Sequence, residues 1–207
     1  MMNSVKLWQT TSSLLESNLD SACNFDDEQE REFVTQRYGD TDFHMYRHKN
    51  PSEWRYHFTK IHRFMCVAEA LATMSKDTST KVGALIFGPG YEIRSQGWNG
   101  APRGSRADVD SRFKDRDEKL FWAAHAEMNA ITNAARTGTP TEGSALLATH
   151  FPCMRCAVSI VQAGIAEVIC PEPEGGFAER WAEDIRRTKE LFYECSVRLV
   201  TFTEKRK

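Results

Sequence analysis

Residues 145–170, ALLATHFPCMRCAVSIVQAGIAEVIC, form the stretch that decides the fold. The apolar run at 145–149 predicts a buried strand, and the segment 154–163 predicts a helix that ends at Gly164. A second apolar run at 166–170 predicts another buried strand. Strand, helix and strand in this order are the repeating unit of an α/β domain.

The alternation of strands and helices continues on both sides of this stretch. The turn at 88–90, Gly-Pro-Gly, predicts a hairpin, and an amphipathic helix begins near Trp54. We expect a five-stranded mixed sheet with helices on both faces, a three-layer α/β/α domain. The predicted strands lie at 82–87, 91–98, 145–149, 166–170 and 197–202, and the predicted helices at 54–71, 126–136, 154–163 and 178–193.

The first part of the chain differs from this pattern. Residues 1–52 are polar and mixed in charge, and we treat them as an N-terminal extension of unknown role before an α/β domain at 53–207. Within the extension, short helices are predicted at 5–19 and 27–37. Within the domain, residues 99–122 are predicted to form a long polar loop.

Two short clusters of chemically active side chains stand out, His125-Ala126-Glu127 and Cys153-Met154-Arg155-Cys156. A catalytic zinc ion takes three protein ligands and keeps a fourth position open, and His125, Cys153 and Cys156 supply those three. If Ala126 starts a helix, His125 and Glu127 both lie at its first turn and can face one pocket. Glu127 is then free to move protons. His-x-Glu followed by Pro-Cys-x-x-Cys is the signature of zinc-dependent nucleobase deaminases.

Other uses of these cysteines have to be considered. A Cys-x-x-Cys motif is also typical of redox pairs and of structural zinc sites, and Cys170 or Cys195 could supply the third sulfur of a closed site. A structural site, however, has no need of Glu127 two residues from the histidine. We therefore favour the catalytic interpretation.

Composition narrows the class of protein. The 207 residues carry a formal net charge of −2, whereas general nucleic-acid binders usually carry a basic excess. There is no apolar run long enough for a membrane span, and the first residues lack the apolar core of a signal peptide. Six cysteines do not make a disulfide framework in a chain of this size. We expect a cytoplasmic protein without a membrane partner and without stable nucleic-acid binding.

Several segments together resemble the deoxycytidylate (dCMP) deaminases of the cytidine deaminase-like superfamily, over residues 54–202. Thr78 stands where that family often has proline. The resemblance implies that residues 53–207 are a zinc-dependent deaminase domain of cytidine deaminase-like fold. The similar segments are SKDTSTKVGA at 75–84, GWNGAPRG at 97–104, HAEMNAI at 125–131, FPCMRCA at 151–157 and QAGI at 162–165.

The resemblance also implies a substrate site on the 97–104 segment. It places Asn99 on the sugar hydroxyl, although Asn99 could instead only shape the turn. Arg103 is the best candidate for the phosphate, which arginine can grip bidentately. Aromatic side chains, His150 included, could form a wall beside the base or simply belong to the core. The substrate-binding residues that we assign are Trp98, Asn99, Arg103, Ala126 and Phe151.

The implied reaction is hydrolytic deamination of dCMP to dUMP, with Zn²⁺ as cofactor and Glu127 as the general acid and base. Members of this family are often oligomers, activated by dCTP and inhibited by dTTP, so a homo-oligomer with these effectors is implied. Two alternatives stay open: a deaminase of a tRNA or single-stranded DNA base, and a zinc-stabilised binding module without activity. The net charge counts against the first and Glu127 against the second.

Overall fold

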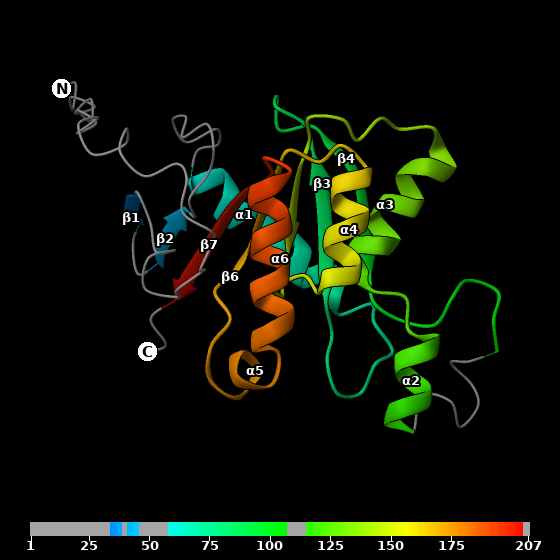
Figure 1. Cartoon of the computed structure of the whole chain (residues 1–207). Helices are drawn as coiled ribbons and strands as arrows, with labels where there is room; N and C mark the ends of the chain where they lie inside the picture. The colour runs from blue at the N-terminus through cyan, green and yellow to red at the C-terminus, as the bar shows by residue number, and fades with distance from the viewer. Residues whose placement is uncertain (1–33, 39–40, 46–57, 107–114, 205–207) are drawn as a thin grey trace.

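The computed structural model describes residues 34–38, 41–45, 58–106 and 115–204. These residues form a seven-stranded mixed sheet with the order β1-β2-β7-β6-β5-β3-β4 (Figure 1). The strands are β1 (Val34–Tyr38), β2 (Thr41–Met45), β3 (Gly83–Phe87), β4 (Ile93–Trp98), β5 (Ala145–Ala148), β6 (Glu167–Pro171) and β7 (Arg198–Glu204). The helices are α1 (Phe58–Ala72), α2 (Arg116–Trp122), α3 (Ala126–Thr137), α4 (Met154–Gln162), α5 (Gly175–Arg180) and α6 (Ala182–Glu194).

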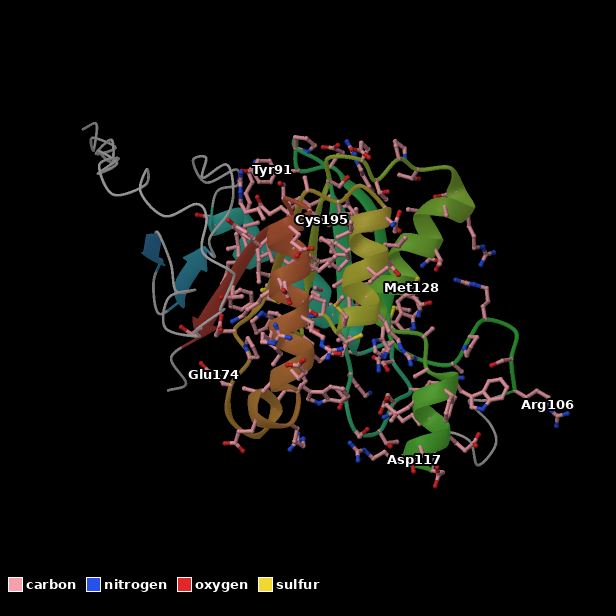
Figure 2. All side chains as sticks on the ribbon, in the orientation of Figure 1. Tyr91, Arg106, Asp117, Met128, Glu174 and Cys195 are labelled. Carbon is pink, nitrogen blue, oxygen red and sulfur yellow. The ribbon has the colours of Figure 1, made fainter. Side chains whose placement is uncertain are left out.

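Two apolar clusters, one on each face of the sheet, make the three layers. On one face, α1 packs through Ile61, Met65, Ala68 and Leu71 onto alternate residues of the strands. The remaining strand residues turn to the opposite face, because successive side chains of a strand point to opposite sides. There they meet α3, α4 and α6. Side chains fill both spaces between the sheet and its helices (Figure 2). The predicted three-layer α/β/α architecture is confirmed.

The central strands β5, β6 and β7 are parallel, whereas β3 is antiparallel to both β5 and β4. All five predicted strands form, as β3 to β7. The sheet is larger than expected because β2 pairs with the outer edge of β7 and β1 pairs with β2. The helix predicted at 27–37 is therefore wrong for residues 34–37, which lie in β1. The rest of that prediction, and the one at 5–19, lie outside the described residues.

Two further boundaries differ from the sequence prediction, and a third cannot be compared with it. The segment 99–122 is not all loop, because α2 forms at its end, where the Asp115 side chain accepts a hydrogen bond from the Glu118 amide. The helix predicted at 178–193 is divided at Trp181 into α5 and α6. The predicted start of α1 at Trp54 lies outside the described residues. α3 ends at Thr137, one residue beyond the predicted end, and Gly138 after it adopts a left-handed backbone conformation with φ of 67°.

Within the described residues, none of the helices combines the length and the apolar character that crossing a bilayer would require.

Candidate metal and catalytic site

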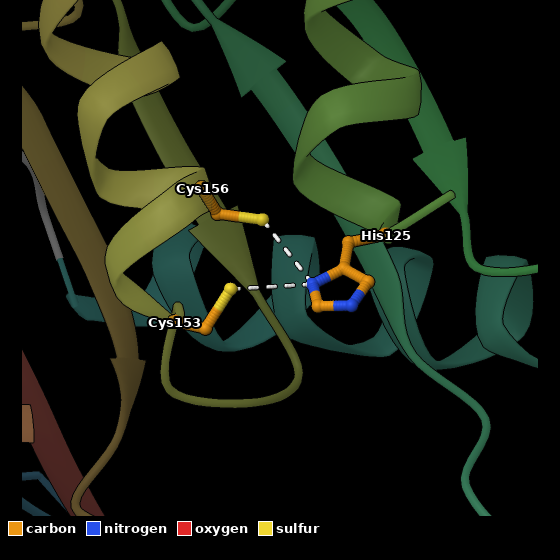
Figure 3. Close-up of side chains that lie close together, drawn as sticks. All are labelled: His125, Cys153 and Cys156. Atoms are coloured by element: carbon orange, nitrogen blue, oxygen red, sulfur yellow. Dashed lines mark hydrogen bonds between the residues drawn. The ribbon is translucent and has the colours of Figure 1, made fainter. Parts of the chain in front are cut away.

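The predicted ligands lie together where two helices begin. His125 is the N-cap of α3, and Cys153 is the N-cap of α4, with Cys156 in its first turn. The His125 Nδ1 atom lies 3.4 Å from the Sγ atom of Cys153 and 3.4 Å from that of Cys156 (Figure 3). All three ligand atoms lie within 4.8 Å of one another. One nitrogen and two sulfurs thus surround a common point.

These distances fit zinc. With Zn–S about 2.3 Å and Zn–N about 2.0–2.1 Å, a tetrahedral site has N···S edges of about 3.6 Å. The observed N···S distances of 3.4 Å are close to that value. Among the described residues, no further His, Cys, Asp or Glu joins the cluster. Neither Cys170 nor Cys195 closes the site as a fourth ligand, because neither belongs to the cluster. Cys170 is buried within β6, and Cys195 is exposed at the end of α6.

Glu127 lies beside the cluster without belonging to it. It occupies the first turn of α3, two residues after His125, and its exposed fraction is 4%. Burial raises the pKa of its carboxyl to about 7, because a buried carboxylate loses its hydration. A carboxyl that titrates near neutral pH can both take up and release a proton under physiological conditions.

The two thiols are strongly coupled. The hydrogen bond from the Cys156 thiol, followed by that from His125, lowers the pKa of Cys153 to about 4. The pKa of Cys156 is raised, chiefly by this interaction with Cys153 and then by burial. Cysteines bind zinc as thiolates, so zinc binding here would displace the proton of the Cys156 thiol.

α3 is held against β4 at unusually close range. Gly97 faces the first turns of α3, where an added Cβ would lie 2.4 Å from Ala126 O and 2.4 Å from Ala130 N. Two asparagines then bind the strand backbone: Asn129 Nδ2 donates to Trp98 O at 2.7 Å and Asn133 Nδ2 to Gln96 O at 2.8 Å. The helix start that carries His125 and Glu127 is fixed to the sheet by these contacts.

Three of the predicted substrate residues lie at one hollow. Trp98, Asn99 and Arg103 line a cavity of about 220 Å³. His125, Glu127 and the two cysteines are not part of its lining. The remaining lining residues are Met74, Lys76, Asp77, Gly100, Ala101, Pro102, Gly104 and Ser105.

Asn99 is largely committed to contacts within the protein. Its Oδ1 accepts from the Val82 amide at 2.8 Å, and its Nδ2 donates to Thr80 O at 2.8 Å and to Asp77 Oδ2 at 3.3 Å. Its exposed fraction is 8%. These bonds tie the 97–104 segment to the residues that precede β3. Arg103 is more available, with its Nη2 donating to Asn133 Oδ1 at 3.1 Å on the surface.

The other two predicted substrate residues lie in the core. Ala126 is fully buried at the start of α3, and Phe151 is buried in the cluster beneath α4. His150, beside Phe151, contacts the ring of Phe177 edge-on with centroids 4.6 Å apart. Burial lowers the pKa of His150, which favours its neutral form.

Two features of the surrounding structure were missed from the sequence. Lys119 of α2 forms an ion pair with the buried Asp77, with Nζ and Oδ2 2.6 Å apart. Asp184 of α6 accepts a hydrogen bond from the Met154 amide at the start of α4. Asp77 lay within a segment used for the resemblance, but neither partner could be identified, because each contact joins residues at least thirty positions apart.

Comparisons with known proteins agree with this geometry. Residues 58–172 match the family model described as the cytidine and deoxycytidylate deaminase zinc-binding region. The chain therefore belongs to the cytidine and deoxycytidylate deaminase family and contains its zinc-binding region.

Two individual relatives and one solved structure are also similar to this chain. A protein of Aliivibrio fischeri named as an uncharacterized deaminase in the luxG 3′ region is 41% identical over 135 residues, covering 65% of this chain and 88% of that relative. Human deoxycytidylate deaminase is 40% identical over 110 residues, which is 51% of this chain and 61% of the human protein. The crystal structure of cyanophage S-TIM5 dCMP deaminase with dCMP and dUMP superposes with a TM-score of 0.52 at 25% identity, covering 65% of this chain and 95% of that one.

Proposed function

We propose that this chain catalyses the zinc-dependent hydrolytic deamination of dCMP to dUMP. The observation that carries the proposal is the buried Glu127 carboxyl beside a His/Cys/Cys cluster that leaves one tetrahedral position open. An inert zinc module has no use for a buried acid there. The relatives named as deoxycytidylate deaminases, and the phage enzyme solved with dCMP and dUMP, support this substrate.

His125, Cys153 and Cys156 would hold the zinc. Bound zinc supplies the Lewis acidity that makes water nucleophilic near neutral pH. Glu127 takes a proton from the attacking water and delivers it to N3 of the cytosine ring. It then moves the remaining proton of the added water, from the new hydroxyl at C4, to the amino group, so that ammonia leaves and a carbonyl is left at C4. Burial of Glu127 raises the pKa of its carboxyl to about 7, near neutral pH, which suits a group that must both take up and release a proton.

A mononucleotide fits the charge of the protein better than a polynucleotide does. One phosphate needs a few fixed donors, whereas a strand-binding groove needs a long track of them. The hollow beside the 97–104 segment offers Lys76 and Arg103 among its lining residues, and the chain as a whole has a formal net charge of −2. We assign Arg103 to the phosphate.

The other four residues assigned to the substrate site would act in different ways. Trp98 lines the same hollow as Arg103, and its indole face could stack on a base or ribose there. Ala126 and Phe151, being buried, would act by shaping the pocket floor, and Asn99 by holding the loop that carries Arg103. The proposal further includes a cytoplasmic location, a homo-oligomer, and regulation by dCTP and dTTP, for which the family resemblance is the support.

A substrate panel tests this function. Purified zinc-loaded protein is assayed with dCMP, deoxycytidine, dCTP and a single-stranded oligonucleotide containing one cytosine, with ammonia release as the readout. We expect dCMP to have the highest kcat/KM. Higher kcat/KM for the oligonucleotide or for deoxycytidine would contradict the mononucleotide proposal and leave the metal chemistry intact.

A further inference from the structure

The start of α4 carries both thiols of the metal site, but its own N-cap side chain makes no hydrogen bond to the first amides of the helix. Its N-cap, Cys153, makes no side-chain capping hydrogen bond, and the first turn contains no acidic residue. The first amides of a helix have no partner within the helix, and an N-cap side chain normally accepts from one of them. Cys153 is directed elsewhere, since its Sγ lies 3.4 Å from His125 Nδ1. The capping group has to come from another element.

Asp184 supplies that group. Its Oδ2 accepts a hydrogen bond of 2.9 Å from the amide of Met154, the first residue of α4. Asp184 lies in the first turn of α6, which packs beside α4 and runs in the same direction (Figure 1). A half-buried carboxylate bound to an amide at a helix start is a charge-assisted hydrogen bond, and it is favoured by the helix dipole.

The peptide held in this way is the one between Cys153 and Met154. Its carbonyl, on Cys153, accepts from the Ala157 amide at 2.9 Å, and its N–H donates to Asp184. Because both ends are bonded, the peptide plane cannot rotate without breaking one of these hydrogen bonds. These two bonds hold the Cα atom of Cys153 at the start of α4, from which its side chain places Sγ 3.4 Å from His125 Nδ1.

We propose that Asp184 is a positioning residue of the metal site, which holds the start of α4 so that Cys153 Sγ stays aimed at the point it shares with His125 and Cys156. The inference rests on the proposed function only in taking these three residues as the zinc ligands. It goes beyond that function by assigning a role in zinc retention to a residue of a different helix, thirty-one positions after Cys153 in the sequence.

A simple structural cap would behave differently. It would stabilise the folded chain and leave the metal site unchanged. Glu183, the neighbour of Asp184, provides the matched control, because it lies in the same first turn but pairs with Arg186 and Arg187 of its own helix. Removing either carboxylate deprives α6 of one favourable charge at its start, but only the Asp184 variant frees the Met154 amide.

The first test measures zinc release from the full chain to an excess of a chromogenic chelator. We expect D184A to lose zinc about 10- to 100-fold faster than the parent, the range typical of groups that orient metal ligands. D184N keeps an acceptor oxygen and should stay within about threefold of the parent, and E183A should match the parent. Release from D184A at the rate of E183A would overturn the proposal.

A second test removes the donor instead of the acceptor. Proline is tolerated at the first position of a helix and has no N–H, and Cys153, with φ of −73° and ψ of 164°, already has the backbone that precedes proline. M154P therefore deletes the hydrogen bond with little distortion. In the M154P background, D184A should change zinc release by less than about twofold, because the two changes remove one interaction.

If D184A speeds zinc release in the M154P background by as large a factor as it does in the parent, the proposal is contradicted. The cobalt-substituted proteins give a spectroscopic readout that a change in stability alone would not move: D184A should weaken the thiolate-to-cobalt charge-transfer band, and D184N should restore it. If D184A does not fold, M154P decides the outcome: it deletes the same hydrogen bond and should lose zinc about 10- to 100-fold faster than the parent, and release at the parent's rate would overturn the proposal. Zinc release is measured without substrate. A parent protein that holds zinc but does not deaminate dCMP would refute the proposed function, and the zinc-release rates could still be compared.

Discussion

The two helices that meet at the metal site are held in place by different means. α3 lies directly on β4, where Gly97 allows backbone contact and two asparagines bind the strand backbone. α4 receives its principal polar contact at its start from Asp184 of α6. α3 contributes one ligand and the buried Glu127, whereas α4 contributes the two thiols.

This difference has a physical reason. A metal ligand is held in place partly by the metal that it binds, so its helix needs only to orient the ligand side chain toward the metal. Glu127 binds no metal in the proposed mechanism, so the packing of the protein alone has to keep it in place. The closer contact is found on the helix that carries Glu127, the proposed acid and base. The predictions below test whether activity depends on α3 and zinc retention on α4 in this way.

The largest effect is expected on the α4 side from C156A. Loss of one thiolate should abolish stoichiometric zinc binding and reduce turnover to background, and it should lower Tm because bound metal stabilises the folded state. C66A is the control, since Cys66 is an exposed cysteine on α1. Metal analysis, Tm and ammonia release are compared in the same preparations. Retention of full zinc by C156A would show that another group closes the site.

On the α3 side, G97A should destabilise the protein strongly. The new Cβ would lie 2.4 Å from two backbone atoms of α3, which cannot move aside as a flexible side chain could. We expect a loss of about 3 kcal/mol in the free energy of unfolding, as in overpacked cores. G100A is the matched control, because a Cβ at Gly100 meets nothing within 4 Å. Equal stabilities of the two variants, measured by urea unfolding, would show that α3 is not held at close range.

R103A addresses the surface next to α3. Loss of a charged hydrogen bond to the phosphate should raise KM for dCMP about tenfold, with little change for deoxycytidine, which has no phosphate. R116A, an exposed cation on α2, is the control. If R103A affects both substrates equally, Arg103 does not bind the phosphate.

The smallest effects are expected from replacing the two asparagines of α3, and the two variants should differ from each other. N129A removes a partly buried bond to Trp98 O near the catalytic end and should lower the free energy of unfolding by about 1 kcal/mol and reduce kcat. N133A removes two exposed bonds one turn further, to Gln96 O and from Arg103 Nη2, and should have about half the effect on stability. Equal effects on kcat would indicate that distance from Glu127 does not matter.

Much of the fold could be predicted because its signals are local. Apolar runs bounded by glycine and proline marked β3 to β7, and a motif of fixed spacing brought His125, Cys153 and Cys156 together. The helix starts at Ala126 and Met154 were also close to the prediction.

The features that were missed depend on partners far away in the sequence. β1 and β2 are short, and they form where the edge of β7 is available to pair. The role of Asn99 was interpreted from its loop alone, but its amide bonds to Val82, Thr80 and Asp77 of the segment before β3. Asp184 carries no local signal at all for its bond to α4.

The central claim is that α3 supplies an acid and base that is not a zinc ligand, and E127Q tests it most directly. Zinc content and dCMP turnover are measured on one preparation of E127Q, with E118Q, an exposed acid on α2, as the control. We expect E127Q to hold one zinc per chain and to keep a parent-like Tm, with kcat lowered about 10²- to 10⁴-fold, as is usual for the loss of a general acid and base. Loss of zinc from E127Q, or turnover close to that of the parent, would contradict the central claim.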